Sequence, residues 1–324
     1  MPEIATIDIE PFRLGDAEAR LAVAKSFGEA FEDIGFAVIV GHGIPGQLMD
    51  DTYAAAKAFF DMPLGAKLAL QPPEKVKARG YLPMGIESVS ATLTGETPPD
   101  LCEALVFAGI HRELRGDPNA RPNYWPTDPP QLTGLIQSYA RSVETLTRQL
   151  MEMSALALDL PEDYFDADFA DPNMTFRFVN YPDQVEEPKP GQLRYGEHHD
   201  YGGLTILRQD SAPGGLQIWD PVVGWWDALS PHNSFVINVG DLMARWTNDR
   251  WSSTLHRVIN PSRQLTGSTQ RLSMVAFTGP NDNTEVVALP TCVDEAHPAK
   301  YEPVRAGPYI RSKIAASHEL STTR

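Results

Sequence analysis

The chain has 324 residues, of which 42% are hydrophobic and 22% are charged, proportions typical of a folded globular protein rather than a disordered one. Its 43 acidic residues outnumber its 27 lysines and arginines, which gives a formal net charge of −16. Because such a field repels phosphate backbones and anionic lipid surfaces, we expect neither a nucleic acid nor a membrane as a partner.

The cysteines and the first residues indicate the compartment. Cys102 and Cys292 form no CxxC pair and no framework of four or more, so we expect neither disulfides nor a thiolate metal site. The first eight residues are acidic where a signal peptide would be basic, and no apolar run approaches the length of a membrane span. We therefore expect a cytoplasmic protein, and no obligate protein partner is evident.

The first half predicts a mainly helical region with a few strands. Alternating apolar residues predict a short strand over 5–9, and helical spacing predicts a helix over 16–34 with Asp16 as its N-cap. A buried strand follows over 36–40. Further helices are predicted from Pro45 to about Phe60 and over 132–158.

After residue 171 the pattern changes to short strands separated by turn residues, which is typical of a sandwich or barrel. We expect strands over 175–181, 195–200, 204–208, 216–219, 234–239, 254–259, 272–277 and 285–287. Eight strands suffice for a double-sheet jelly roll. A helix over 301–316 is expected to close the chain. We divide it into a helical or mixed N-terminal region (1–170) that packs on the core, a jelly-roll catalytic domain (171–290) and a C-terminal helical segment (291–324).

The most informative stretch is Gly196-Glu197-His198-His199-Asp200-Tyr201-Gly202. Residues i and i+2 of a strand share one face, so His198 and Asp200 can reach a single metal while His199 points the other way. Two neutral histidines and one carboxylate with open positions is the arrangement that non-haem Fe(II) oxygenases use. His256, in a strand pattern further along, is our candidate for the third ligand.

Arg271 and Ser273 are predicted to share one face of another strand. An arginine offers a planar fork for a carboxylate, and a nearby hydroxyl can bond a further oxygen. This pair can therefore hold a small acid beside the metal.

These motifs together resemble the iron(II)- and 2-oxoglutarate-dependent dioxygenases, specifically the isopenicillin N synthase-like branch, and the resemblance spans nearly the whole chain. Its further matches are Tyr181-Pro182, Asp200-Tyr201-Gly202-Gly203-Leu204-Thr205, Asn238-Val239-Gly240-Asp241, Gly35-Phe36, His42-Gly43-Ile44 and Arg79-Gly80-Tyr81. The resemblance implies an α+β fold, with a distorted double-stranded β-helix (jelly roll) as core, a mainly helical N-terminal region and a C-terminal helix.

The resemblance also implies roles for named residues. His198, Asp200 and His256 would bind Fe(II), Arg271 and Ser273 would bind the distal carboxylate of 2-oxoglutarate, and Tyr181 would assist there. We expect Tyr81, Glu103 and Phe277 in the substrate wall.

The implied reaction is an oxidation of a small organic molecule, such as one of secondary metabolism. Hydroxylation is favoured over desaturation. The reaction uses O2, is coupled to decarboxylation of 2-oxoglutarate to succinate and CO2, and can be supported by ascorbate.

Three alternatives stay open at this point. Isopenicillin N synthase and aminocyclopropanecarboxylate oxidase keep the same motifs without using 2-oxoglutarate, and a non-catalytic metal or ligand sensor could keep the site without turnover. A zinc hydrolase could use the same three ligands, but Arg271 and Ser273 would then lack a role. The doubled histidine leaves the role of His199 open, although spacing to Asp200 favours His198 as the ligand.

Overall fold

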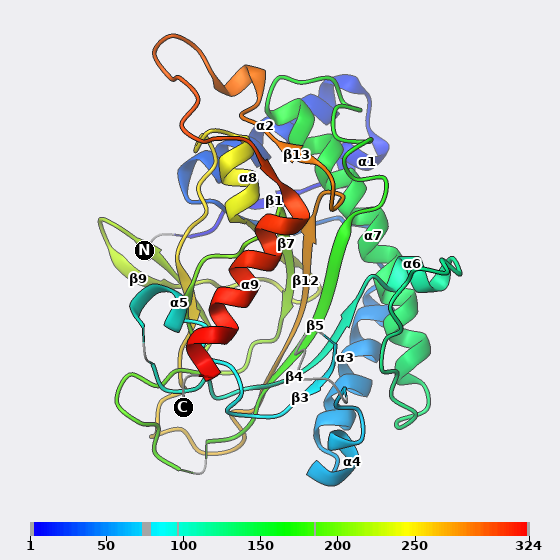
Figure 1. Ribbon diagram of the computed structural model, residues 1–324, viewed down its shortest axis with the longest axis vertical. Helices are drawn as coiled ribbons and strands as arrows, with labels where there is room; N and C mark the ends of the chain where they lie inside the picture. The colour runs from blue at the N-terminus through cyan, green and yellow to red at the C-terminus, as the bar shows by residue number, and fades with distance from the viewer. Residues whose placement is uncertain (1–2, 73–78, 96, 185, 323–324) are drawn as a thin grey trace.

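The computed structural model describes residues 3–72, 79–95, 97–184 and 186–322. Its centre is a large twisted sheet, with helices on one side and a smaller sheet on the other (Figure 1). Met1 and Pro2, which belong to the acidic start noted above, lie outside the described residues.

The large sheet has eight strands and contains segments from both halves of the chain. All neighbours in it are antiparallel except the parallel pair β1 and β2. In spatial order the strands are β1 (Thr6–Asp8), β2 (Phe36–Val40), β10 (Phe235–Val239), β7 (Leu204–Gln209), β12 (Arg271–Gly279), β5 (Asn173–Tyr181), β4 (Glu103–Ala108) and β3 (Gly80–Leu82). The strands of the first half therefore extend both edges of the core sheet.

The smaller sheet has four antiparallel strands. In spatial order these are β6 (Tyr195–His198), β11 (His256–Val258), β8 (Leu216–Asp220) and β9 (Gly224–Asp227). A separate hairpin pairs β13 (Glu285–Val286) with β14 (Val304–Arg305). Among the described residues no strand pairing closes the sheets into a barrel, so the structure has the sheet-rich core that we expect but not a closed jelly roll.

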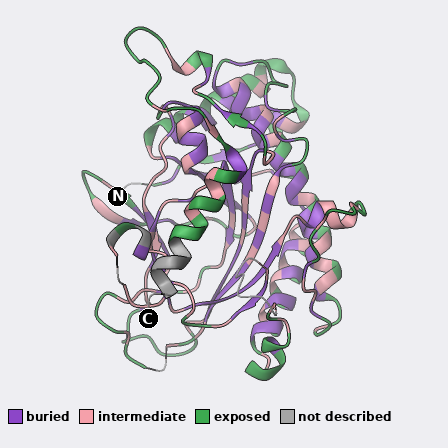
Figure 2. Ribbon diagram, in the orientation of Figure 1, coloured by how far each residue is buried: buried purple, intermediate pink, exposed green. Residues whose placement is uncertain are grey.

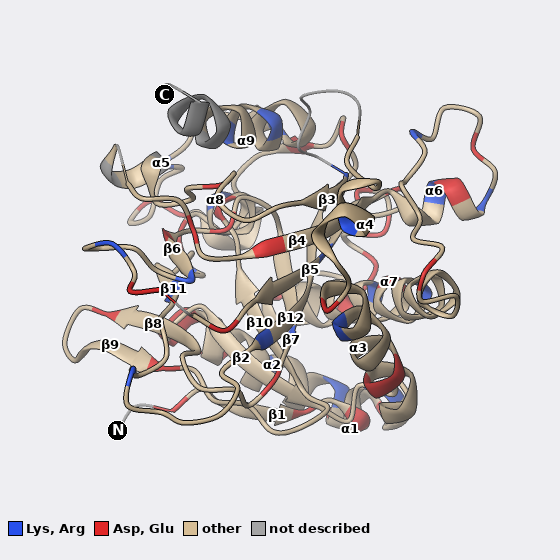
Figure 3. Cartoon of the chain, turned by 90° about the horizontal axis from the view of Figure 1, so that it is seen from below, with Lys and Arg blue, Asp and Glu red and all other residues tan. Residues whose placement is uncertain are grey.

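Helices cover the face of the large sheet opposite the smaller sheet, where α2 and α3 each pack against α7 (Figure 3). The view from below shows α3 and α7 on one side of this sheet and β6, β8, β9 and β11 on the other (Figure 3). The helices are α1 (Glu10–Leu14), α2 (Ala17–Asp33), α3 (Gly46–Phe60), α4 (Leu64–Leu68), α5 (Ala91–Thr94), α6 (Ile110–Leu114), α7 (Leu132–Ala157), α8 (Asp241–Trp246) and α9 (Ala306–Thr322), with a 3₁₀ turn at Pro290–Cys292.

Strand alternation divides the core into two layers. On β2, Ala37 and Ile39 join the main cluster beneath the helices, whereas Phe36 and Val38 join a cluster between the two sheets. Because both faces are covered, the strands of the large sheet are buried over most of their length (Figure 2). The space between the two sheets is where polar side chains of the second half converge.

Most of the predicted elements are confirmed within a few residues, including the helix that begins after Asp16, whose carboxylate accepts a hydrogen bond from the Ala19 amide at 3.0 Å. Four short strands, β3, β4, β9 and β14, are absent from the sequence prediction, and β14 occupies the start of the segment expected to be the last helix, which begins at Ala306. Both cysteines are free, as predicted. Within the described part of the chain, no helix combines the length and apolarity needed to span a membrane.

Candidate active site

Three predicted side chains meet between the two sheets. The Nε2 atoms of His198 and His256 lie 3.5 Å and 3.8 Å from Oδ1 of Asp200, and one ligand atom from each residue lies within 4.8 Å of the others. Two atoms that each lie about 2.1 Å from one ion can be at most about 4.2 Å apart. The separations of 3.5 Å and 3.8 Å therefore suit a single metal.

The backbone fixes which histidine nitrogen faces the centre. His198 ends β6 and His256 begins β11, and these two residues are directly opposite in the antiparallel pair. Each Nδ1 lies at hydrogen-bond distance from the backbone carbonyl two residues earlier, at 2.9 Å for Gly196 and 3.0 Å for Thr254. With Nδ1 used as donor, Nε2 is left as the metal-binding atom.

Asp200 lies just after the end of β6, and two neighbouring side chains fix its carboxylate. Its Oδ2 accepts hydrogen bonds from the Thr205 hydroxyl at 2.6 Å and from the Asn238 amide at 2.7 Å. Thr205 is on β7 and Asn238 is on β10, so the large sheet orients a ligand that the small sheet carries. Oδ1 is thereby directed at the two imidazoles.

The protonation states suit metal binding. Burial and the neighbouring His198 lower the pKa of His256 to about 4, so its imidazole is neutral at physiological pH. Burial raises the pKa of Asp200, but the two imidazoles and the hydrogen bond from Asn238 outweigh it and hold that pKa well below its ordinary value. Neutral imidazoles and an ionised carboxylate are the forms that bind a divalent metal.

A narrow cavity of about 60 Å³ leads from this centre to Arg271. Arg271 and Ser273 both line it from β12, and Tyr181 lines it from the facing position on β5. The expected i, i+2 relation of Arg271 and Ser273 is therefore present. All six predicted metal and cosubstrate residues line this one cavity.

Arg271 is buried and is held by backbone and side-chain oxygens. Its guanidinium donates to Oε1 of Gln209 at 2.5 Å and to the carbonyls of Ala212 at 2.9 Å and Asp210 at 3.1 Å. The Asp210 carboxylate lies 3.3 Å away and accepts a hydrogen bond from the Tyr53 hydroxyl at 2.8 Å. Among the described residues, the buried Nε of Arg271 has no partner, so one donor is left for an acid in the cavity.

The three residues expected in the substrate wall have different locations. Phe277 lines the inner cavity and also a larger outer cavity next to the metal ligands. Tyr81 and Glu103 line neither cavity. Their side chains are hydrogen-bonded to each other, and Glu103 also accepts from Lys67 Nζ at 2.7 Å and from the Asn180 amide at 2.8 Å.

Strand alternation explains why Tyr81 and Glu103 do not match the expectation. Tyr81 belongs to the cluster beneath the helices, and so do Leu105 and Phe107, which share a face of β4 with Glu103. The alternating residues Ala104 and Val106 face the space between the sheets instead. Val106, not Glu103, reaches the outer cavity.

Sequence reasoning assigned no role to Thr205, Asn238, Arg177 or Glu87. Asn238 is a polar residue inside the apolar strand Phe235–Val239, and a buried polar side chain needs a partner, so this signal was present. The second histidine of the doublet, His199, lines the outer cavity, and its Nδ1 lies 2.8 Å from the Ser253 carbonyl. His199 is not among the three residues whose ligand atoms lie close together.

Two family models match the chain. Residues 4–128 match the model described as non-haem dioxygenase in morphine synthesis N-terminal, and residues 172–280 match the model of the 2OG-Fe(II) oxygenase superfamily. Together they cover most of the chain, including all predicted site residues.

Curated proteins and solved structures agree with these models. The chain is 32% identical to the 2-oxoglutarate-Fe(II) type oxidoreductase hxnY of Emericella nidulans, over 96% of this chain and 89% of that protein. It is 30% identical to validamycin A dioxygenase of Streptomyces hygroscopicus subsp. limoneus, over 88% of this chain and 79% of that protein.

Among solved structures, a full-length Neurospora crassa protein in complex with alpha-KG and thymine superimposes with a TM-score of 0.84 at 31% identity, over 97% of this chain and 96% of that chain. The chain therefore belongs to the 2OG-Fe(II) oxygenase superfamily, as a 2-oxoglutarate- and Fe(II)-dependent dioxygenase.

Proposed function

We propose that His198, Asp200 and His256 hold the catalytic Fe(II), and that Arg271 and Ser273 bind the distal carboxylate of 2-oxoglutarate with Tyr181 beside them. The observation that carries this proposal is the single cavity that connects the three ligand atoms with the unused Nε–H of Arg271. Bound Fe(II) would supply the place where O2 and 2-oxoglutarate react to oxidise the substrate, with succinate and CO2 as products.

The residues of the chain then have separate tasks. The backbone carbonyls at Gly196 and Thr254 orient the two imidazoles, and Thr205 and Asn238 orient the carboxylate of Asp200. Arg271, fixed by three oxygens, orients the cosubstrate from the opposite end of the cavity. Burial of the site excludes bulk water from the reacting groups.

The outer cavity, of about 300 Å³, is the proposed substrate pocket. It shares His198, Asp200 and Phe277 with the inner cavity, so a molecule bound there would lie next to the metal. The names of the similar proteins include validamycin A and thymine, which are small organic molecules. We therefore propose a small organic metabolite as substrate, with hydroxylation as the reaction favoured over desaturation.

We also assign the core to the distorted double-stranded β-helix, with the two sheets as its facing halves and residues 171–290 as the catalytic unit. Support comes from the antiparallel order of the second-half strands and from the position of the site between the sheets. The proposed compartment is the cytoplasm, which fits the two free cysteines.

The experiment adds 2-oxoglutarate to anaerobic Fe(II)-loaded protein and records the visible charge-transfer absorption of an iron-bound keto acid. Wild type is expected to show the band, and His256→Ala is expected to lose it together with iron binding. Succinate release in air, with ascorbate and a library of small molecules, then tests turnover.

Two outcomes would favour the alternatives. Substrate oxidation without consumption of 2-oxoglutarate would indicate an isopenicillin N synthase-like oxidase. The absorption band without O2 uptake under any substrate would indicate a sensor.

A further inference from the structure

Apart from Asp200 of the metal site, the acidic and basic side chains that line the outer cavity form two pairs. Glu87 with Arg177 lies near the metal ligands, and Asp282 with Arg311 lies further out, where the helix α9 covers the cavity. The remaining walls are largely apolar and come from Val89, Val106, Ala108, Phe277, Ile310 and Ile314.

The inner pair is largely buried. Arg177, on β5, lines both cavities, and its Nη2 lies 2.5 Å from Oε2 of Glu87, with 14% and 15% of the two side chains exposed. Burial lowers the pKa of Arg177, but the adjacent Glu87 outweighs this effect and raises it above its ordinary value. Arg177 is therefore charged, and its guanidinium forms an ion pair with the Glu87 carboxylate.

Arg177 keeps one free donor. Its Nη1 lies 3.4 Å from the Tyr195 hydroxyl, and its buried Nε has no hydrogen-bond partner among the described residues. A buried N–H without a hydrogen-bond partner is energetically unfavourable. A ligand oxygen in the pocket would remove that cost without disturbing the bond to Glu87.

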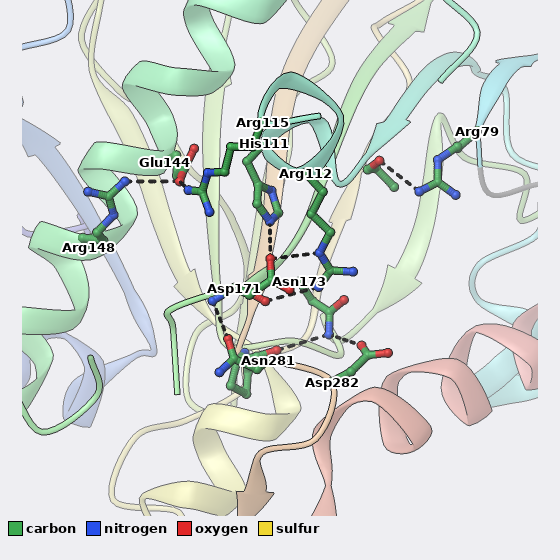
Figure 4. Close-up of polar contacts among 12 residues, drawn as sticks. Arg79, His111, Arg112, Arg115, Glu144, Arg148, Asp171, Asn173, Asn281 and Asp282 are labelled. Atoms are coloured by element: carbon green, nitrogen blue, oxygen red, sulfur yellow. Dashed lines mark hydrogen bonds and ion pairs between the residues drawn. The ribbon is translucent and has the colours of Figure 1, made fainter. Parts of the chain in front are cut away.

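The outer pair is neutralised in the same way. Arg311 lies 2.8 Å from Oδ2 of Asp282, and the Asn173 amide donates to Oδ1 of Asp282 at 2.6 Å. The side chains of Asn173 and Asp282 lie beside the helix α9 (Figure 4). Burial raises the pKa of Asp282, but these hydrogen bonds outweigh it and lower the pKa below its ordinary value. Asp282 is therefore ionised and matched by Arg311.

A charged substrate is disfavoured by this arrangement. A carboxylate that accepts a hydrogen bond from Arg177 would add a second negative charge beside Glu87, and an ammonium beside Glu87 would add a second positive charge next to Arg177. Either would leave one buried charge without its partner, which is far more costly than the loss of a surface ion pair. An uncharged molecule leaves the ion pair of Glu87 and Arg177 intact and adds no unpaired charge.

We propose, on the basis of the function proposed above, that the substrate is an uncharged small molecule whose apolar body packs on Phe277, Val106 and Ile310 and whose carbonyl or hydroxyl oxygen accepts a hydrogen bond from Nε of Arg177. Arg177 and Glu87 together are then the residues that select against charged molecules.

Three probes of nearly equal size test the proposal: benzamide (neutral), benzoate (anionic) and benzylamine (cationic). Their binding is measured by calorimetry on anaerobic Fe(II)- and 2-oxoglutarate-loaded protein, so no turnover is needed. Benzamide is expected to bind at least tenfold more tightly than either charged probe. Equal or tighter binding of benzoate or benzylamine, or binding of none of the three, would overturn the proposal.

Glu87→Gln gives the sharper test, because it leaves Arg177 charged and unpaired. The affinity for benzoate relative to benzamide should rise at least tenfold. Glu144→Gln is the matched control: Glu144 is likewise a carboxylate paired with arginines, Arg115 and Arg148, but it lies on α7 (Figure 4) and does not line the cavity. It should leave the order of the probes unchanged.

A second variant covers the case in which Glu87→Gln does not fold. Arg177→Met leaves Glu87 unpaired and should favour benzylamine instead. An unchanged order of probes in the folded variant would refute the role of the pair. If the charge-transfer band forms but a charged probe binds best, only this inference fails, whereas absence of the band refutes the proposed function itself.

Discussion

Thr205→Val removes a single hydroxyl from the support of the metal site. The Thr205 side chain is buried, and valine has nearly the same shape, so the packing of β7 is retained. The change deletes the 2.6 Å hydrogen bond to Oδ2 of Asp200 and leaves the Asn238 amide as the remaining donor to that oxygen. The carboxylate becomes less firmly directed at the metal.

The size of the effect follows from the type of bond. A hydrogen bond to a charged group contributes about 1.5–3 kcal/mol, and because Asn238 remains, we take the lower value of about 1.5 kcal/mol. This corresponds to a roughly tenfold weaker metal affinity, within the range of about 10–100-fold found when groups that orient a metal ligand are changed. Removing both donors, with Thr205→Val and Asn238→Leu together, should cost more than about 100-fold, because Oδ2 is then buried without a partner.

The assay is anaerobic calorimetric titration with Fe(II), repeated with Mn(II), for wild type, both single variants and the double variant. Thr147→Val is the control, since Thr147 is equally buried but its hydroxyl bonds the Val143 carbonyl within α7. It should leave metal affinity unchanged. If Thr205→Val binds metal within twofold of wild type and the double variant within about fivefold, the assigned orientation of Asp200 is incorrect.

Three further outcomes are expected. Tyr53→Phe removes the 2.8 Å bond to Asp210, the carboxylate beside Arg271, and should raise the KM for 2-oxoglutarate about fivefold with little change in kcat; a changed kcat with an unchanged KM would contradict this. Burial raises the pKa of Asp100 to about 7, so the folded state favours the protonated carboxyl and stability falls as pH rises from about 4 to 7. Asp100→Asn should therefore reduce the difference in unfolding free energy between pH 5 and pH 8 by about 2 kcal/mol, measured by urea unfolding. An undiminished difference would refute this role of Asp100. Lys67→Met leaves Glu103 buried beside Tyr81 without its cation, so it should lower the free energy of unfolding by about 3 kcal/mol without affecting metal affinity. Loss of metal binding in the folded variant would instead indicate that Lys67 and Glu103 belong to the active site.

Local pattern was sufficient for much of the site. His198 with Asp200, and Arg271 with Ser273, are each two residues apart, so the period of a strand already puts each pair on one face. His256 was predicted because the chemistry needs a third ligand and the residue lies in a strand pattern. The long helices α2, α3 and α7 were likewise predictable, because their apolar residues recur at the helical period over many turns.

The same reasoning did not predict the short strands β3 and β4. β3 has three residues, too few for a periodic signal, and β4 reads as a continuous apolar run after Glu103. Since these strands were not predicted, the faces of Tyr81 and Glu103 could not be assigned. A difference of one residue in register places a side chain on the other face of a sheet. The observed register places Tyr81 and Glu103 on the face toward the helices, away from the cavity.

The sequence by itself was therefore enough to predict the kind of metal site and the residues that we propose for it, because those residues are grouped by local spacing and by the chemistry of their side chains. Only the tertiary structure decided what surrounds them. Glu87 and Arg177 are 90 residues apart, and Thr205 and Asn238 reach Asp200 from two strands of the opposite sheet. Such contacts depend on strand order and register, which are set by how the whole core packs and are not encoded in any one segment.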